Sequence, residues 1–265
     1  MAKPFIKWAG GKSQLLQQIE TYLPAGFDDM QDMTYIEPFV GGGAMLFHML
    51  STHKNISRAI INDISSNLII AYRTIQTQPE PLIERLFEIQ EEYRKFDNDH
   101  RQEYFYKMRD SFNGEYTNDV ENTAMFIFLN RTCFNGLYRE NSKGKFNVPF
   151  GRYANPTICD AETIRSDSEL LQQVEILRGD YTQVENYIDG SNTFIYFDPP
   201  YRPLNATSSF NSYVKEPFND EEQRRLEKFF AQMSDEGCLL MLSNSDCSAK
   251  NPEDRFFEDL YSNFL

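Results

Sequence analysis

The stretch from Phe194 to Tyr201, FIYFDPPY, carries the residue types best suited to chemistry. Its first four residues are apolar or aromatic, which predicts a buried strand of a parallel sheet, and two prolines then end that strand. Asp198 therefore lies at the carboxyl end, where ligands of open α/β sheets gather. The Asp198 carboxylate and the Pro199 carbonyl can both accept from an exocyclic amine, while Tyr201 can stack on the ring that bears it. A turn without function is the alternative, since Asp-Pro-Pro is also ordinary turn chemistry.

The N-terminal stretch PFIKWAGGK contains a glycine turn beside Trp8 and Lys12, ahead of an amphipathic helix. It resembles the end of a phosphate-binding loop, but that motif needs a glycine where Ile6 stands, so this interpretation fails. A cation next to an aromatic side chain can instead hold the carboxylate of a small zwitterion. A simple cap of the following helix is the alternative.

A second glycine turn, residues 41–43, follows a short strand that ends in Glu37 and precedes an apolar helix from Ala44. Glycines let the backbone approach a ligand closely, and the helix N-terminus faces that ligand. Leu46 breaks the dinucleotide fingerprint GxGxxG, and the turn has no basic residue for a pyrophosphate, so it indicates a nucleoside-type ligand without phosphates. Asp63 closes the next strand at the spacing where an acid accepts from ribose hydroxyls, although a role at the start of the next helix is the alternative.

The other periodicities predict an α/β protein interrupted by an insertion. Five apolar runs predict buried strands, at Tyr35, Ile60, Val174, Phe194 and Leu239. Residues 64–131 have helical periodicity throughout, which is too long for a plain doubly wound unit and indicates an inserted helical subdomain. The polar loop 202–218 is of the kind that covers a bound base. Two strands lead to polar side chains, namely Asp180 for one and Ser243, Asn244 and Asp246 for the other.

A basic stretch, residues 130–153, stands out from an acidic chain. The net charge of −14 argues against a nucleic-acid partner, but binding depends on where the charges lie. Turn signals surround short aromatic-rich runs here, which predicts a hairpin, and basic residues alternate with the aromatic ones. A nucleic-acid surface is the favoured interpretation and a solvated loop the alternative. The charged residues are Arg131, Arg139, Lys143, Lys145 and Arg152 against Glu140.

Composition excludes several classes of protein. At 265 residues with 40% hydrophobic residues, the chain can form one large domain or one domain with an insertion. It has no apolar run of about 18 residues and no secretory signal. The four cysteines form no CxxC, and the three histidines do not cluster along the chain. We therefore expect a reduced cytoplasmic protein without a membrane span and without a metal site.

Taken together, seven stretches between residues 5 and 246 resemble a Dam-type (D12 class) DNA adenine-N6 methyltransferase. They are FIKWAGGK, IEPFVGGG, INDIS, NRTCFNGLYREN, FNVPFGRY, YFDPPY and LSNSD. The resemblance implies a Rossmann-like α/β sheet of seven strands with an inserted helical and β-hairpin target-recognition subdomain. Residues 1–76 and 160–265 would form the catalytic domain and 77–159 the insertion. It also implies methyl transfer from S-adenosylmethionine to N6 of a flipped-out adenine in duplex DNA, commonly within GATC.

The resemblance also assigns residues. The motif that holds the target adenine is Asp198, Pro199, Pro200 and Tyr201. Cofactor contacts are expected from Trp8, Lys12, Asp63 and Asp198, with Glu37, Phe39, Gly41, Gly43 and Asp180 added from the glycine turn and the strand ends. Phe134 matches the family's aromatic wedge between bases. Further DNA contacts are expected from Asn135, Arg139, Lys143, Pro149, Arg152 and Tyr153. Ala154 departs from some relatives, which carry a lysine there.

Three other functions compete with this interpretation. RNA or protein-glutamine N-methyltransferases usually carry Asn-Pro-Pro-Tyr and lack the basic hairpin. A DNA-binding module without chemistry is disfavoured by the intact Lys12, Asp63 and Asp198, and an NAD-dependent oxidoreductase by Leu46. The expected partners are double-stranded DNA and, in the cell, a restriction endonuclease, and we expect a monomer. Because relatives continue with two more strands, we expect a chain ending at Leu265 to be less stable and more prone to associate than an extended one.

Overall fold

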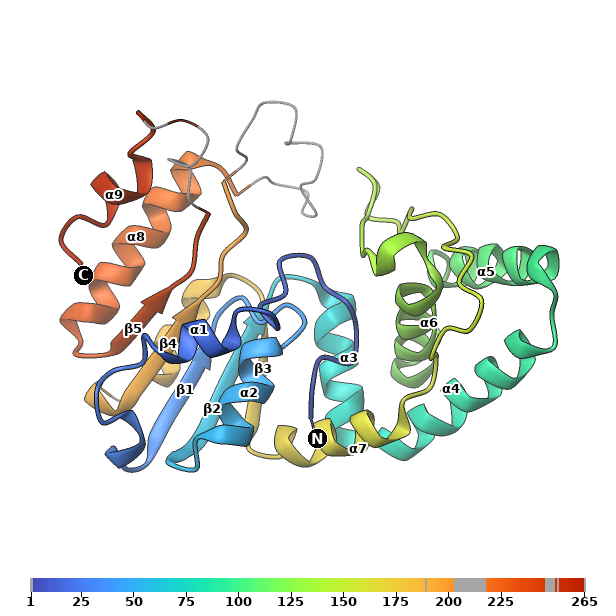
Figure 1. Ribbon diagram of the computed structural model, residues 1–265, viewed down its shortest axis with the longest axis horizontal. Coiled ribbons are helices and arrows are strands. Elements are labelled where there is room, and N and C mark those ends of the chain that lie inside the picture. The colour runs from blue at the N-terminus through green and yellow to red at the C-terminus, as the bar shows by residue number, and fades with distance from the viewer. Residues whose placement is uncertain (1, 189, 203–217, 246–250, 252, 265) are drawn as a thin grey trace.

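The computed structural model contains a five-stranded parallel sheet in the order β3-β2-β1-β4-β5 (Figure 1). It describes all residues except 1, 189, 203–217, 246–250, 252 and 265. The five strands fall where the apolar runs predicted them, which confirms the α/β class; the described residues do not include the two further strands that the resemblance implied. The strands are β1 Met33–Glu37, β2 Ile56–Asp63, β3 Val174–Arg178, β4 Thr193–Phe197 and β5 Leu239–Leu242.

The central strands are buried on both faces, as apolar runs in parallel sheets usually are. Successive side chains alternate between the faces, so Tyr35 and Phe194 pack on one side while Ile36 and Ile195 pack on the other. β1 and β4 are buried along their whole length. β5 was expected to be buried too, but its residues are only partly buried, because among the described strands it has a neighbour on one side only.

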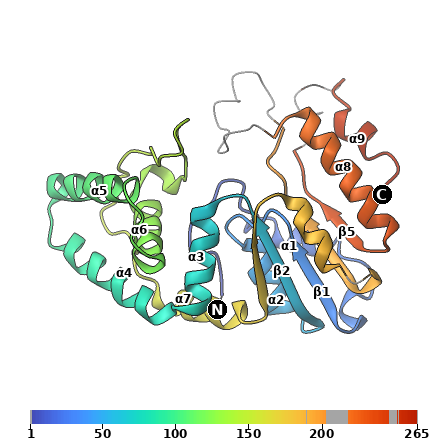
Figure 2. The same cartoon turned by 180° about the vertical axis from the view of Figure 1, so that it is seen from behind.

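Helices cover both faces of the sheet (Figures 1 and 2). One face packs against α1, α2, α3 and α7, and the other against α8 and the 3-10 helix η3. The α-helices are α1 Leu16–Glu20, α2 Ala44–Thr52, α3 Ser66–Thr77, α4 Pro79–Arg94, α5 Asn98–Phe112, α6 Asp119–Thr132, α7 Ala161–Leu171, α8 Asp220–Asp235 and α9 Phe256–Leu260. The 3-10 helices are η1 Phe27–Asp29, η2 Phe134–Gly136, η3 Tyr181–Tyr187 and η4 Gly190–Asn192.

Side-chain caps fix where several helices begin. Ser65 accepts from the backbone N–H of Leu68 at the start of α3, and α4 begins with Pro79, whose missing N–H costs nothing at that position. Asn219 accepts from two backbone N–H groups at the start of α8. Similar caps are supplied to α5, α6 and α7 by Asp97, Asn118 and Asp160.

Helices α4, α5 and α6 lie beside the sheet rather than over it (Figures 1 and 2). α6 is the central helix of this group, because it is buried on all sides and packs against α3, α4 and α5. Aromatic residues at helical spacing form the core between them, as expected. Phe128, for example, contacts Tyr93, Tyr104 and Phe105 with ring centroids 5.6–6.4 Å apart.

Residues 130–153 do form a hairpin with antiparallel arms, but no described residue of it belongs to a regular strand. Two isolated bridges, Cys133 to Phe150 and Glu140 to Phe146, and the backbone hydrogen bonds beside them join the arms. The 3-10 helix η2 interrupts the first arm between the two bridges, so the pairing does not continue from one bridge to the other. On its outer side, Phe146 is bound by Asn113 at the end of α5, which accepts from its N–H at 2.8 Å and donates to its carbonyl at 2.9 Å.

The start of α2 sets a strict size limit on Gly43. Its φ of +75° is a left-handed conformation, and a Cβ there would lie 2.4 Å from the hydroxyl oxygen of the buried Tyr72. Gly237 shares the left-handed conformation, with φ +85°, but a Cβ there would have no described atom within 4 Å. Comparing substitutions at the two glycines therefore separates the energetic cost of backbone strain from that of a steric clash.

We expect Gly237→Ala to lower the free energy of unfolding by about 1–2 kcal/mol, because only the left-handed backbone is strained. Gly43→Ala should cost at least about 1 kcal/mol more, because it also overpacks the core. Urea unfolding of both variants measures the difference, and adding Tyr72→Phe to Gly43→Ala should recover part of it. Equal costs for the two glycines would contradict the steric argument.

Candidate active site

The carboxyl ends of the central strands bring three acids to one edge of the sheet. Glu37 ends β1, Asp63 ends β2, and Asp198 directly follows β4. β1 lies between β2 and β4, and the chain builds the sheet outward from it in both directions. This topological switch point is where open α/β sheets bind ligands. The acids therefore line the expected binding edge.

Asp198 forms a buried ion pair with Lys12. The Lys12 Nζ lies 2.6 Å and 2.5 Å from the two carboxylate oxygens, and it also donates to the carbonyl of Gly10 at 2.9 Å. Lys12 is only 5% exposed and Asp198 18%. The ring of Tyr201, which is 42% exposed, has its centroid 4.7 Å from the same ammonium. Both ends of the DPPY motif thus contact one cation from the N-terminal turn.

Burial and charge act in opposite directions on this pair. Burial raises the pKa of Asp198 by disfavouring its charged form, and Lys12 offsets only part of that rise. Burial alone would lower the pKa of Lys12, but the charge and hydrogen bonds of Asp198 raise it on balance. Lys12 is therefore the group that favours an ionised, hydrogen-bond-accepting Asp198.

Glu37 lies on the same edge of the sheet but is more deeply buried than Asp198. It is 2% exposed and accepts a hydrogen bond from the hydroxyl of Tyr35 at 3.0 Å. Burial raises the pKa of Glu37 well above its usual value, and the nearby Asp198 adds to this, while the bond from Tyr35 opposes it. The carboxyl is thereby biased toward its neutral form, which can donate as well as accept.

Asp63 organises the glycine turn and the start of α3 at once. Its carboxylate accepts from the N–H of Gly41 at 3.1 Å and from that of Ser65 at 2.9 Å. Burial raises the pKa of Asp63, and these backbone N–H groups work against that rise. Asp63 is not the N-cap of α3, which is Ser65, but it holds the backbone of that cap residue. Since a carboxylate has about four acceptor positions, it can still accept from a ligand.

The glycine turn is closed from above by an aromatic residue. A Cβ on Gly41 would lie 2.8 Å from Trp8, so only glycine fits beneath the indole. Trp8 is partly buried and stacks on Tyr138, with ring centroids 5.4 Å apart and an interplanar angle of 17°. On the other side, the hydroxyl of Tyr72 donates to the carbonyl of Gly41 at 3.0 Å. The turn is held in shape by its neighbours.

Asp180 and Phe39 have structural contacts of their own. Asp180 accepts from Arg225 at 2.8 Å and 2.9 Å and from the N–H of Thr182 at 3.0 Å. Partial burial would raise the pKa of Asp180, but these hydrogen bonds lower it on balance. Phe39 packs on Tyr181 with centroids 5.1 Å apart. Among the described contacts, Asp180 is thus joined to α8 and not to Lys12 or Asp198.

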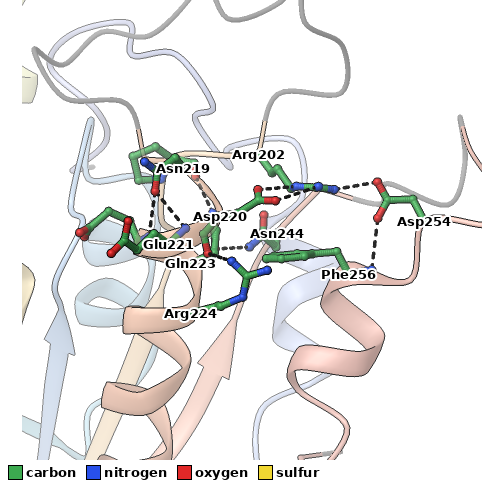
Figure 3. A network of polar contacts seen from close by, with 11 residues as sticks. Arg202, Asn219, Asp220, Glu221, Gln223, Arg224, Asn244, Asp254 and Phe256 are labelled. Atoms are coloured by element: carbon green, nitrogen blue, oxygen red, sulfur yellow. Dashed lines mark hydrogen bonds and ion pairs between the residues drawn. The ribbon is translucent and has the colours of Figure 1, made fainter.

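The chain that leaves the DPPY motif is anchored to α8 and to the C-terminal segment (Figure 3). Gln223, which is fully buried, donates to the carbonyl of Pro200 at 3.2 Å. Arg202 donates to both oxygens of Asp220 at 2.7 Å and 3.1 Å and to Asp254 at 2.7 Å. Within the described residues no hydrogen bond occupies the carbonyl of Pro199, which leaves it available as an acceptor. Figure 3 shows this network together with Asn219, Glu221, Arg224, Asn244 and Phe256.

The expected DNA-contacting residues are distributed along the irregular hairpin, from its base near Phe134 to its turn near Lys143. Phe134 is 53% exposed, an unusual position for a large apolar side chain, and its N–H donates to the carbonyl of Pro149 at 2.8 Å. The exposed Asn135 follows with φ +57°, a conformation that asparagine tolerates better than most residues. Arg139 is exposed and donates from Nε to Asn147 at 2.8 Å, while its two terminal nitrogens make no hydrogen bond to described residues.

The remaining residues singled out in this stretch are exposed in some cases and enclosed in others. Lys143 and Arg152 are exposed, whereas Tyr153 is partly buried, with the ammonium of Lys7 5.7 Å from its ring centroid. Arg131 was counted among the surface charges, but it is mostly enclosed and donates to the carbonyl of Phe5 at 2.7 Å. Burial lowers the pKa of Arg131 accordingly. It supports the N-terminal segment and does not belong to the exposed surface.

Sequence reasoning missed Asn130, which joins that segment to the hairpin. This fully buried side chain accepts from the N–H of Lys7 at 2.9 Å, and donates to the carbonyls of Lys7 at 2.8 Å and Gly136 at 3.1 Å. A single asparagine at the end of the apolar run TAMFIFLN was a signal that could have identified it. Sequence reasoning also missed the contacts of Lys7 with Asn130 and Tyr153, because Lys7 lies outside the basic stretch.

Two of the three histidines lie close together in space, so the expectation that the histidines do not cluster is wrong for His48 and His53. His48, on α2, and His53, which follows α2, both approach Glu20. Among the described cysteines, Cys133, Cys159 and Cys238 are free thiols. No helix in the described ranges is long and apolar enough to cross a bilayer. The expected base-covering loop and Asp246 lie outside the described residues, apart from the two ends of that loop.

Comparison with known proteins shows the family. The family described as D12 class N6 adenine-specific DNA methyltransferase matches residues 8–265. The Type II methyltransferase M.MjaIII of Methanocaldococcus jannaschii is 48% identical over 264 residues, covering 99% of this chain and 89% of that protein. The Type II methyltransferase M1.LlaDCHI of Lactococcus lactis subsp. cremoris is 41% identical over 268 residues, covering 99% and 85%.

The DNA adenine methylase of Escherichia coli strain K12 is 31% identical over 249 residues, covering 92% of this chain and 81% of that protein. These matches confirm the resemblance and argue against the RNA-, protein- and NAD-directed alternatives. The chain belongs to the D12 class of N6 adenine-specific DNA methyltransferases, enzymes that methylate specific sites in DNA.

Proposed function

We propose that this enzyme methylates N6 of an adenine that has flipped out of duplex DNA, with S-adenosylmethionine as the donor and GATC as the target. The observation that carries the proposal is the buried Lys12–Asp198 pair at the switch point of the sheet, with the ring of Tyr201 beside it. When bound, S-adenosylmethionine supplies an electrophilic methyl group. The GATC target rests on the resemblance to the Dam type.

The residues of this edge suit such a donor. Its ribose hydroxyls can donate to Asp63, and its carboxylate can pair with the ammonium of Lys12. The missing side chain of Gly41 makes room for Trp8, which is thereby held against the turn at this edge. Glu37 and Phe39 line the end of the same strand, whereas Asp180 would act through the order it gives to η3.

Asp198 and Pro199 would make the adenine amine a better nucleophile. The lone pair of an exocyclic amine is delocalised into the ring, which makes the nitrogen a poor nucleophile. Hydrogen bonds from its two N–H groups to the Asp198 carboxylate and the Pro199 carbonyl would localise that lone pair on nitrogen. The enzyme then works by orientation and by preorganised acceptors. An ionised Asp198 is a stronger acceptor than a protonated one, and Lys12 would favour the ionised form.

The base must leave the duplex to reach these acceptors. Flipping costs a few kcal/mol, and stacking on the exposed ring of Tyr201 would return about 1–3 kcal/mol. Phe134 stands exposed on the hairpin and is suited to fill the space that the base leaves. Arg139 has its two terminal nitrogens available for a guanine edge, while Lys143 and Arg152 are placed to contact phosphates.

We assign the proposed functions to the two parts of the chain that the sequence analysis distinguished. Residues 1–76 and 160–265 would perform the chemistry and residues 77–159 would recognise the target. The two relatives named as Type II methyltransferases favour a role beside a restriction endonuclease in the cytoplasm. A decisive first experiment offers tritiated methyl donor with duplex DNA, RNA and protein side by side. Labelling of N6-adenine in GATC duplexes only would support the proposal, and labelling of RNA or protein would contradict it.

Asp198→Asn should reduce methyl transfer more than a hundredfold, because the amide removes the negative charge that accepts from the amine. Stability should change little, since the amide oxygen can still accept from Lys12. Asp198→Ala should also be inactive but less stable, because it leaves the buried ammonium without its partner. Single-turnover methylation and thermal unfolding measure both effects. Retention of more than a few per cent of the activity in either variant would refute the assignment of Asp198.

Lys12→Met should move the acidic limb of the pH–rate profile to higher pH. Asp198 accepts more strongly from the amine when it is ionised, and its pKa, already raised by burial, rises further once the opposing charge is removed. The measurement is the rate against pH at saturating donor, which separates this effect from weaker donor binding. Lys54→Met, at an exposed lysine, is the matched control. An unchanged acidic limb with only a higher KM for the donor would limit Lys12 to cofactor binding.

Arg139→Ala should change the sequence specificity of the enzyme, whereas Lys143→Ala should change its overall affinity for DNA. An arginine that reads a guanine edge contributes about 1–3 kcal/mol of discrimination, so Arg139→Ala should methylate single-base variants of the site up to about a hundredfold better relative to GATC. Lys143→Ala should weaken binding to all duplexes equally and reduce the slope of log K against log salt by about 0.9. Methylation of a panel of oligonucleotides at several salt concentrations tests both. A uniform loss in both variants would make Arg139 a phosphate contact.

A further inference from the structure

Two histidines and two acids meet at the end of α2 that lies away from the glycine turn. His48 lies on α2 and His53 directly follows its last residue, Thr52. Glu20 is the last residue of α1, and Asp28 lies in η1. Neither the fold nor the proposed methylation chemistry uses these four side chains.

The donor atoms are close enough to share one ion. One nitrogen of each histidine and one carboxylate oxygen of Glu20 lie within 4.8 Å of one another. Nε2 of His53 is 3.1 Å from one oxygen of Glu20, and Nε2 of His48 contacts the other. A tetrahedral zinc ion with bonds of about 2.0–2.1 Å holds its donor atoms about 3.3–3.4 Å apart. The distance between His53 and Glu20 is close to this value, whereas His48 and Glu20 must move apart to admit the ion.

The second acid fixes the orientation of His53. Oδ1 of Asp28 lies 2.6 Å from Nδ1 of His53. A neutral imidazole that donates from Nδ1 to Asp28 presents the lone pair of Nε2 on the opposite side. Carboxylates hold metal-binding histidines in this way in many proteins, which fixes the tautomer and strengthens the ligand.

The Nε2 of His53 makes no hydrogen bond to a described residue, which leaves it available to a cation. His53 is 3% exposed, and its Nε2 is buried without a hydrogen-bond partner in the described structure. A carboxylate oxygen of Glu20 lies 3.1 Å from that nitrogen but off the direction of a hydrogen bond. A positive ion between them satisfies both groups. The partial exposure of His48 and Glu20, 23% and 33%, provides a path for the ion and for a water ligand.

We propose that Glu20, His48 and His53 bind one divalent transition-metal ion, with zinc as the best fit, and that Asp28 positions His53. Two imidazole nitrogens and a carboxylate oxygen form a donor set that zinc accepts readily, and water can complete the tetrahedron. The ion would fasten the end of α1 to the end of α2. Because the carbonyl of Lys12 accepts from the N–H of Leu15 just before α1, the bond would also steady the turn that carries Lys12.

The test uses the untagged, reduced, full-length protein freed of metal by chelation. Calorimetry with Zn²⁺ should give one site, and thermal unfolding should shift upward by several degrees at a hundredfold excess over the Kd. Co²⁺ should give the visible absorption bands of a tetrahedral nitrogen and oxygen site without thiolate charge-transfer bands. Absence of stoichiometric binding, or a thiolate signature, would overturn the proposal.

Variants identify the ligands. Glu20→Gln and His48→Gln, both at partly exposed positions, should each weaken Zn²⁺ binding at least a hundredfold. Asp28→Asn should weaken it about 10- to 100-fold through the orientation of His53. His100→Gln is the matched control, because this exposed histidine contacts only Asp97 among the described acids and should leave affinity unchanged. Full affinity in Glu20→Gln or His48→Gln, or an equal loss in the control, would place the ion elsewhere.

Discussion

The ion pair between Lys12 and Asp198 is the interaction on which the site depends. Taking a carboxylate and an ammonium out of water costs several kcal/mol each, and only close geometry and further hydrogen bonds return that cost. Here both oxygens of Asp198 lie within 2.6 Å of the ammonium, and Gly10 accepts from it as well. The pair joins residues 186 positions apart and fixes the N-terminal turn over the end of β4. Losing either partner would leave the other buried and unpaired.

Local patterns predicted the strands, the helices and much of the edge where the site lies. Apolar runs ended by prolines or acids suffice for this, because strand formation and termination depend on neighbouring residues. The sequence likewise named Lys12 and Asp198 separately. It did not show that they pair, because that contact depends on how β1 and β4 become neighbours. For the same reason the bond between Asp180 and Arg225 could not be foreseen.

The errors have the same origin. Asn113, from another element, binds the backbone of Phe146 on the outer side of the hairpin, which no local pattern indicated. The histidines were judged by their distance along the chain, whereas Glu20 approaches them from a separate helix. In each case a polar side chain from elsewhere completes a local arrangement. Hydrogen-bond partners distant in sequence are what periodicity cannot report.

The N-terminal segment, residues 5–12, links target recognition to chemistry. On one side Asn130 holds the backbone of Lys7, and Trp8 stacks on Tyr138 of the hairpin. On the other side Lys12 holds the carboxylate that would accept from the adenine amine. These contacts are short and lie on a single stretch of eight residues. One short segment therefore contacts both the hairpin and the carboxylate at the end of β4, so the two parts of the proposed site share one physical support.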